Sequence, residues 1–196
     1  MLITGLNALI GLVLGTALGV VGAILAAFLR AIDELAAPLV TALSVVPIVA
    51  LAPVLYTMYG AGAQTARQFI AALAVFVPVY VTTLRGLRQV APVHRDLLRA
   101  YAATRWQATR AVTLPGAVPY LFTGIRIASS LSVITALVAE YFGGPVNGLA
   151  NAITSAAANS NFTLAYAFVL GAILVGLVFF VGGLLLERLA TRHSIT

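Results

Sequence analysis

Charged residues are scarce in this chain, and cysteine and lysine are absent. Only 8% of the 196 residues are charged and 62% are hydrophobic, whereas about a quarter of the residues in a soluble domain are charged. A domain of this length needs polar groups to cover its outside, so an aqueous fold cannot absorb this much apolar sequence. Long continuous apolar runs also differ from the alternating segments of about 10 residues in a membrane β-barrel. The composition predicts an all-α integral membrane protein.

Several kinds of chemistry are excluded by what the chain lacks. Without cysteine there are no disulfides, no cysteine-ligated metals and no thiol catalysis. No GxxxxGK[ST] phosphate-binding loop occurs, and no Gly-x-Ser-x-Gly elbow marks a hydrolase. The two histidines, His94 and His193, belong to no ligand set. We therefore expect no catalytic residue, no metal and no cofactor, and any ATP that drives this protein must be bound by another chain.

Five stretches are apolar enough over about 20 residues to span a bilayer, which predicts a polytopic helix bundle. They are Leu6–Leu29, Leu35–Tyr56, Ala63–Leu84, Pro115–Glu140 and Thr163–Leu186. The second contains Pro38, Pro47 and Pro53, and proline inside a helix removes a backbone hydrogen bond and kinks the rod. Within a membrane such kinks persist where neighbouring helices satisfy the freed carbonyls. We expect this segment to be bent and packed inside the bundle.

Gly11, Gly15 and Gly19 recur at every fourth residue of the first stretch. This spacing puts them on one face of a helix, where the lack of side chains lets another backbone approach closely. A dimer of two copies could use such a face, but packing against another helix of the same chain is the commoner use. We expect packing within the chain.

Arginine is concentrated between Arg85 and Arg110 and in the C-terminal tail. The central segment holds six arginines, whereas the loops predicted for the other side share only Arg67. Short basic loops stay in the cytoplasm, so the central segment and the C-terminus are predicted to lie inside. The net charge of +6 is then explained by basic residues that cluster at the inner membrane surface. It does not indicate that the chain binds nucleic acid. Five spans leave Met1 outside, and this odd count suggests a missing first helix.

The central segment is predicted to form two short helices. Pro92 suits the first position of a helix, where its missing N–H is not needed. Thr104 and Gln107 have the spacing of a capping box, which would begin a second helix at Arg105. That helix is expected to end before Pro115, because a residue preceding proline is disfavoured in the α region.

Leu97, Leu98 and Tyr101 are expected to lie on one side of the first short helix. A short amphipathic helix cannot bury such residues by itself. Two interpretations remain open at this point. The segment rests on anionic lipid headgroups, which attract its arginines, or it docks on a protein partner.

The same segment resembles the cytoplasmic EAA loop of permease subunits in bacterial binding-protein-dependent ABC importers. That pattern runs Glu-Ala-Ala, three residues, Gly, and then an apolar and basic stretch that ends in Leu-Pro. Here 96–98 (Asp-Leu-Leu) stands at the Glu-Ala-Ala position, Ala102 at the glycine, and 114–115 (Leu-Pro) closes the motif. The stretch 139–144 (AEYFGG) is similar to the nitrate/sulfonate/taurine-type branch. The resemblance covers about Ala31 to Leu189.

The resemblance implies a single transmembrane permease domain over 1–196, of the type I ABC importer kind, with the family's first helix missing. It implies a cytoplasmic coupling loop at 85–114, an extracytoplasmic loop at 141–162 and a multi-pass place in the bacterial inner membrane. The implied partners are an ABC ATP-binding subunit, an extracytoplasmic substrate-binding protein, a second permease copy in a homodimer, and the lipid bilayer. The implied substrate is a small polar organic or an anion, with thiamine pyrimidine or riboflavin-type vitamin precursors as the narrower expectation.

By the same resemblance, the ATP-binding subunit docks on six residues of the coupling loop. They are Asp96, Leu97, Leu98, Tyr101, Ala102 and Arg105. The first three depart from the family pattern, since aspartate is one methylene shorter than glutamate and leucine is bulkier than alanine. Ala102 replaces glycine, and because its Cβ clashes in a left-handed turn, we expect a plain helix there.

Arg126 and Glu140 are ionisable residues within the fourth apolar stretch, which makes them pathway or gating candidates. They lie 14 residues apart, or ~21 Å along a helix that rises 1.5 Å per residue, so they cannot pair directly. Other interpretations stay open: Arg126 reaches the inner interface, Glu140 lies at the outer interface, or both serve packing.

Two rival functions remain beside the transmembrane subunit of an ATP-driven importer. An ion-coupled secondary transporter would need several intramembrane carboxylates or an inverted repeat; Glu140 is one candidate carboxylate, and no repeat is evident. A truncated, non-transporting membrane scaffold is favoured by the odd number of spans. The resemblance favours the importer subunit over both.

Overall fold

The computed structural model describes residues 1–60, 63–90 and 92–192, and every regular element in these ranges is a helix. In chain order they are α1 (Leu2–Phe28), α2 (Arg30–Val45), the 3-10 helix η1 (Ile48–Leu51), α3 (Ala52–Tyr59), α4 (Thr65–Arg88), α5 (Pro92–Ala100), α6 (Arg105–Ala108), the π-helix η2 (Thr109–Thr113), α7 (Leu114–Phe142), α8 (Leu149–Ala158) and α9 (Phe162–Arg192). The all-α prediction is confirmed.

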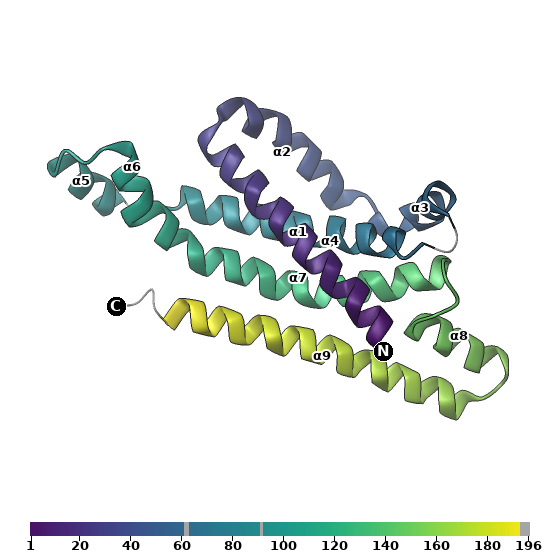
Figure 1. Cartoon of the computed structure of the whole chain (residues 1–196). Helices are drawn as coiled ribbons and strands as arrows, with labels where there is room; N and C mark the ends of the chain where they lie inside the picture. The colour runs from purple at the N-terminus through teal and green to yellow at the C-terminus, as the bar shows by residue number, and fades with distance from the viewer. Residues whose placement is uncertain (61–62, 91, 193–196) are drawn as a thin grey trace.

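Four helical segments among the described residues are long and apolar enough to cross a membrane: α1, α4, the continuous run from α6 to α7, and α9. A fifth crossing arises if α2 and η1–α3, which meet at an angle of 88°, count as one bent span. The bend that the prolines predict is therefore present. The predicted burial is wrong for α2, since in the described range 30–45 Val40 is the one buried residue. The break at Leu29 and the bend after Val45 place α2 on the outside of the bundle (Figure 1).

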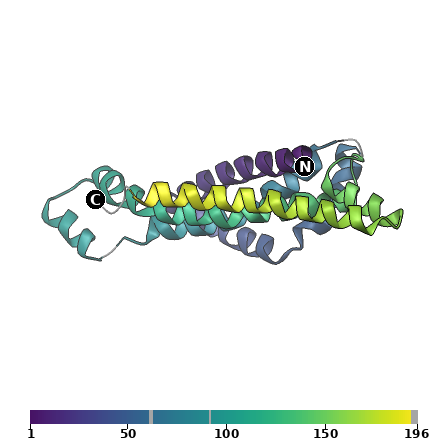
Figure 2. The same cartoon turned by 90° about the horizontal axis from the view of Figure 1, so that it is seen from below.

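The two ends of the bundle carry different elements, as two views at right angles show (Figures 1 and 2). At one end lie α5, α6 and the last turn of α9; we call this the hairpin end. At the other end lie Met1, α3 and α8; we call this the α8 end. The long helices run between these two ends, so the predicted coupling loop and the predicted extracytoplasmic loop are on opposite sides of the molecule.

α4 is the central helix of the fold. It packs against α1 and α7, and α9 packs on the other side of α7. The side chains that α4 buries between its neighbours are mostly small or β-branched and include Ala71, Val75 and Val79. Short side chains let the helix axes come close together, which is how helices associate in a lipid environment without a hydrophobic driving force.

The glycine face of α1 lies directly on α4. A Cβ added at Gly15 would lie 2.7 Å from the Cβ of Val75, and one added at Gly19 would lie 3.1 Å from the Cβ of Val79. Carbon atoms in favourable contact are about 3.5–4.0 Å apart, so the two backbones are too close for any side chain on α1 at these positions. The predicted use of the glycines for packing within the chain is confirmed.

The prediction that the second short helix ends before Pro115 is wrong. Residues Arg105–Phe142 form one continuous helix, and Leu114 keeps helical dihedral angles although it precedes proline. The reason is the π turn η2, in which the Leu114 N–H bonds to the Thr109 carbonyl, five residues back. This wider turn adds a residue and relieves the crowding between the proline ring and the preceding turn. The predicted coupling loop therefore leads into the helix of α7 without a break.

The close approach of α1 and α4 can be tested with Gly15→Val. The added side chain should force the two helices apart and lower the free energy of unfolding by about 1–3 kcal/mol, as overpacking does in a tight interior. Unfolding of the purified protein in mild detergent measures this loss. Gly182→Val in α9 is the matched control, because a Cβ there meets nothing within 4 Å. Equal losses in the two variants would contradict the close approach.

Candidate functional site

The hairpin of α5 and α6 projects from the bundle at the hairpin end (Figure 1). Its second helix starts with the predicted capping box. The Thr104 hydroxyl accepts a hydrogen bond from the Gln107 N–H at 3.4 Å, and the Thr104 N–H donates to the Gln107 side chain at 2.8 Å. These reciprocal bonds satisfy two free donors at the start of α6. The prediction that a second helix begins at Arg105 is confirmed.

The prediction of a plain helix at Ala102 is wrong. Its φ is +48°, in the left-handed region. The Ala103 N–H bonds to the Leu98 carbonyl at 2.9 Å and the Ala102 N–H to the Arg99 carbonyl at 3.0 Å, which is the pattern of a Schellman motif. The two bonds satisfy carbonyls at the end of α5, and this offsets the cost of roughly 1–2 kcal/mol that an L-residue pays in this region. The left-handed turn forms here with alanine at the position where the family pattern has glycine.

A row of exposed apolar side chains runs along α5. Tyr101 is 78% exposed and Leu97 is 54% exposed, and Val93 continues the row four residues earlier. Trp106, on α6, is also exposed. Leu98 is half-buried and therefore less exposed than Leu97 and Tyr101, with which it was predicted to share one side of the helix. Sequence reasoning missed Val93 and Trp106, although the spacing of four between Val93 and Leu97 was a signal for the first.

The polar residues of the predicted docking set lie on the same hairpin and face solvent. Asp96 and Arg99 approach to 3.7 Å, with both side chains largely exposed, and such surface pairs contribute at most about 1 kcal/mol. Arg105 is exposed as well. The hairpin thus exposes apolar and charged side chains to its surroundings. These side chains make few contacts within the hairpin itself.

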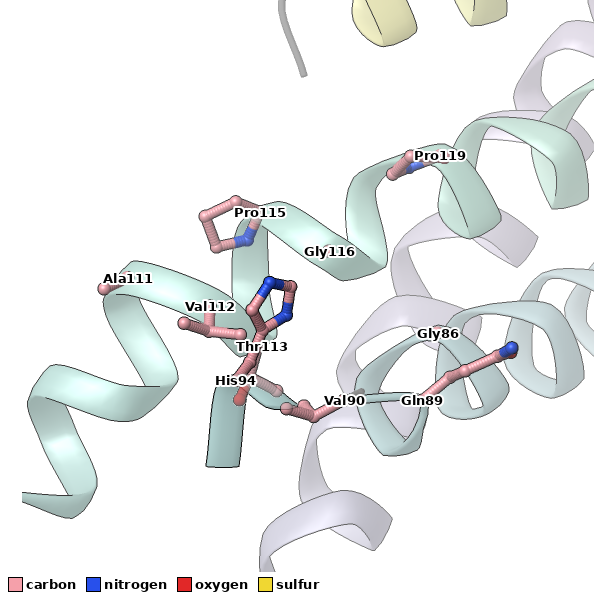
Figure 3. A pocket seen from close by; sticks show the side chains of 10 residues that line it. All are labelled: Gly86, Gln89, Val90, His94, Ala111, Val112, Thr113, Pro115, Gly116 and Pro119. Atoms are coloured by element: carbon pink, nitrogen blue, oxygen red, sulfur yellow. The ribbon is translucent and has the colours of Figure 1, made fainter. Parts of the chain in front are cut away.

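A pocket of about 470 Å³ separates the hairpin from the body of the bundle (Figure 3). Its wall comes from the end of α4, the start of α5, η2 and the start of α7: Gly86, Gln89, Val90, His94, Ala111, Val112, Thr113, Pro115, Gly116 and Pro119. His94 reaches toward η2 across this space (Figure 3). In the described parts of the chain, no three His, Asp or Glu side chains gather to hold a metal ion.

Arg126 and Glu140 do not pair with each other, in agreement with their predicted separation. Arg126 instead forms an ion pair with Glu187 of α9, at 3.0 Å from Nε to Oε2. The other oxygen of Glu187 accepts a hydrogen bond from the Thr123 hydroxyl at 2.6 Å. Two residues of α7 are thereby tied to one carboxylate of α9. The ion pair neutralises two partly buried charges of opposite sign.

Glu140 is fully buried at the α8 end, in contact with three other elements. Its Oε2 accepts hydrogen bonds from the Thr4 hydroxyl at 3.1 Å and from the Ala150 N–H at 3.2 Å. Its Oε1 lies 3.8 Å from Nη1 of Arg67, whose side chain is also 0% exposed. The carboxylate of Glu140 thereby joins α1, α4, α7 and α8.

Arg67 is the functional candidate that sequence reasoning missed. Its guanidinium donates to the carbonyls of Pro145 and Asn147 and to the side chains of Asn147 and Gln64, at 2.6–3.2 Å. The sequence did contain a signal. Arg67 is the single arginine near the loops predicted for the outer side of the membrane. It also lies only two residues after the start of α4, in a mostly apolar helix. An arginine in such a place needs buried acceptors.

The left-handed turn at Ala102 predicts the effect of restoring glycine. Ala102→Gly should stabilise the hairpin by about 1 kcal/mol, because glycine adopts positive φ without the Cβ clash. Amide hydrogen exchange of residues 97–103 should slow several-fold. Ala100→Gly, within α5, is the control. It should speed exchange of the same residues, because glycine in a helix is about 1 kcal/mol less favourable than alanine. Faster exchange in Ala102→Gly would contradict the turn.

Comparison with known proteins gives one family for the chain. The model for the binding-protein-dependent transport system inner membrane component matches residues 15–194. A riboflavin transport system permease protein of Chloroflexus aurantiacus is 32% identical over 85% of this chain and 61% of its own length. A formylaminopyrimidine transport permease protein of Halalkalibacterium halodurans is 31% identical over 68% of this chain and 53% of its own length. The chain thus spans between half and two thirds of these relatives.

A solved structure shares the fold. A chain of an amino acid ABC transporter, crystallised with histidines, superposes with a TM-score of 0.70 at 15% identity, and the match covers 99% of this chain and 90% of the other. The helical arrangement described above is therefore that of a known transporter chain. With the family model extending over nearly all of the sequence, the chain belongs to the inner membrane components of binding-protein-dependent transport systems.

Proposed function

We propose that this chain is the membrane-spanning subunit of an ATP-driven importer and that the α5–α6 hairpin is its docking site for a separate ATP-binding subunit. The observation that carries the proposal is the exposed apolar row of Leu97 and Tyr101, presented on a projecting hairpin. Exposed aromatic and aliphatic groups in a cluster are typical of protein–protein contacts. The family supports an ATP-binding partner in general.

The proposed orientation puts the hairpin end in the cytoplasm and the α8 end outside. Arginines support it, since Arg85, Arg88, Arg99, Arg105 and Arg110 lie in or beside the hairpin, and basic loops stay inside. The loop at 141–162 then faces the extracytoplasmic side, where a substrate-binding protein would deliver its cargo. A second copy of the chain would complete the pathway as a homodimer in the bacterial inner membrane.

In this proposal the chain performs no covalent chemistry. ATP binding closes the partner subunits and displaces the hairpin, and the displacement passes into α7 because Arg105–Phe142 is one continuous helix. The work of the chain is to populate two conformations that open to different sides. A partner can shift that equilibrium only by as much as it binds one conformation better than the other.

For the substrate we propose a small polar organic molecule or anion, with riboflavin or a thiamine pyrimidine as the first compounds to test. The support is similarity alone: the relatives include permease proteins named for riboflavin and for formylaminopyrimidine. Others, such as one of Bacillus subtilis, are named for aliphatic sulfonates. Uptake of each labelled compound by cells with and without the chain would discriminate between the classes.

Co-purification tests the docking site. The chain is co-expressed with the ATP-binding subunit encoded beside it and purified in mild detergent. Wild type should retain the subunit. Leu97→Arg and Tyr101→Asp should each lose at least 90% of it, because a buried charge without a partner costs several kcal/mol. Leu98 is avoided as a first choice, since a half-buried side chain also supports the hairpin itself.

Val146→Arg is the matched control, because Val146 is a highly exposed apolar residue at the opposite end. It should retain the subunit as wild type does. If wild type binds no ATP-binding subunit, the docking proposal fails and the hairpin is a membrane-surface element. If all three variants lose the subunit equally, the exposed row of α5 is not the contact.

A further inference from the structure

A buried polar cluster closes the α8 end of the bundle. It is centred on Arg67 of α4 and Glu140 of α7, both 0% exposed. Around them lie Thr4 and Asn7 of α1, Tyr56 of α3, Gln64 and Gln68 at the start of α4, and the loop residues Pro145 and Asn147. Among the described residues, this polar cluster shares no residue with the pockets near the hairpin end. It is therefore separate from the candidate docking site. The proposed function assigns no role to this cluster.

The guanidinium of Arg67 is fixed by acceptors in several directions. Nη2 donates to the Pro145 carbonyl at 2.6 Å, and Nη1 donates to the Asn147 carbonyl and side chain at 3.2 and 2.9 Å. Nε lies 3.4 Å from the Tyr56 hydroxyl, which itself donates to the Ala139 carbonyl at 2.9 Å. The planar fork of arginine can reach several acceptors in fixed directions, which lysine cannot do. Arg67 therefore holds the loop before α8 by its backbone.

Glu140 holds the same segment from the other side. Its carboxylate accepts from the Ala150 N–H, in the first turn of α8, and from the Thr4 hydroxyl, which in turn accepts from the Leu149 N–H at 3.0 Å. Gly148 has a φ of +104°, and a Cβ at this position would lie 2.5 Å from the carboxylate. The backbone of the loop is thus packed directly on the charged group. This requires glycine both for its conformation and for space.

The cluster fixes the segment 143–158 to the body of the bundle. α8 also packs along α9, but the two charged residues supply polar contacts to the loop from α4 and α7 together. Val146 and Ser155 of the segment are exposed. A loop of this small and polar composition would otherwise sample many conformations.

We propose that Arg67 is a positioning residue that, with Glu140, holds residues 143–158 as a preformed surface for the substrate-binding protein. The proposal rests on the proposed function for the identity of that partner. Preformed surfaces bind more tightly because less conformational freedom is lost on association. Neither charged side chain is accessible, so both act through the segment and do not contact the partner or the substrate.

Amide hydrogen exchange on the isolated chain in detergent tests the positioning. In wild type, residues 143–158 should be protected, above all Leu149 and Ala150, whose N–H groups are bound to Thr4 and Glu140. Arg67→Gln and Glu140→Gln should each speed exchange in 143–158 at least tenfold, because charged hydrogen bonds to the loop are lost. Arg67→Lys should rescue little, since one ammonium cannot replace the fork. Rescue to within twofold of wild type would overturn the role of the fork.

If substitution of the buried Arg67 or Glu140 prevents folding, two other variants still test the proposal. One is a milder change in the same cluster, and the other is a control in a different ion pair. Asn147→Ala removes an acceptor of Arg67 at the half-buried loop and should speed exchange in the same segment a few-fold. Glu187→Gln removes a carboxylate from the other ion pair of α7 and should leave exchange in 143–158 within twofold of wild type. Unchanged exchange in Asn147→Ala, or equal effects of Asn147→Ala and Glu187→Gln, would overturn the proposal.

A second readout separates positioning from a general loss of structure. In the complex with the ATP-binding subunit, ATP hydrolysis is titrated with the substrate-binding protein encoded beside the chain. Asn147→Ala and Arg67→Lys should raise the half-saturating concentration about tenfold, with the maximal stimulated rate changed less than twofold. A fall in the maximal rate with an unchanged half-saturating concentration would contradict positioning.

The two proposals fail in different ways. If no ATP-binding subunit associates with the chain, the proposed function fails, while the exchange data on the isolated chain still decide whether Arg67 and Glu140 position the segment. If the subunit associates but exchange in 143–158 does not respond to these variants, the positioning proposal alone is wrong.

Discussion

The burial of Arg67 and Glu140 is the constraint on which the arrangement of the α8 end depends. Two opposite charges without access to water are stable only if nearly every donor and acceptor is matched. The groups that hydrogen-bond to this pair and around it come from α1, α3, the start of α4, the end of α7 and the loop before α8. Oε1 of Glu140 makes no hydrogen bond to the described residues and is matched by the charge of Arg67 at 3.8 Å. Each of these segments is therefore fixed relative to the others. The tight contact between the glycine face of α1 and α4 holds the same helices together deeper in the bundle.

The hairpin end is built on the opposite plan. On the hairpin itself the Asp96–Arg99 ion pair is exposed, the apolar row faces outward, and a pocket lies between the hairpin and the bundle. Beside the hairpin, Arg88 at the end of α4 forms a partly buried ion pair with Asp33 of α2, at 2.7 Å. Exposed pairs contribute little to stability, so local order within the hairpin rests on the capping box and on the Schellman turn. One end of the chain is thus held by dense internal contacts, whereas the hairpin at the other end leaves its apolar and charged side chains exposed. This asymmetry would suit the proposed docking of a partner on the hairpin.

Hydropathy and proline placement predicted the helical stretches, the bend of the second and the two helices of the hairpin, because these depend on local sequence. The exposure of α2 and the helix through Pro115 were not predictable, since the first depends on packing directions and the second on a π turn. At Ala102 local propensity was overruled by two backbone hydrogen bonds. Arg67 was overlooked because its partners Glu140, Pro145 and Asn147 are 73 to 80 residues away in sequence, and only the fold brings them together.

The continuous helix from Arg105 to Phe142 has a mechanical consequence. Its 38 residues extend about 57 Å at 1.5 Å per residue, and its far end is clamped by Glu140 while its near end carries the projecting hairpin. Such a rod is a lever with its fulcrum near the clamp. A sideways push on the hairpin then becomes rotation of the whole rod, with displacement greatest at the driven end and smallest beside the clamp. A given sideways displacement deeper in the rod therefore needs a larger stroke at the hairpin, and the force there is multiplied in the same proportion, provided that the rod does not flex at the π turn.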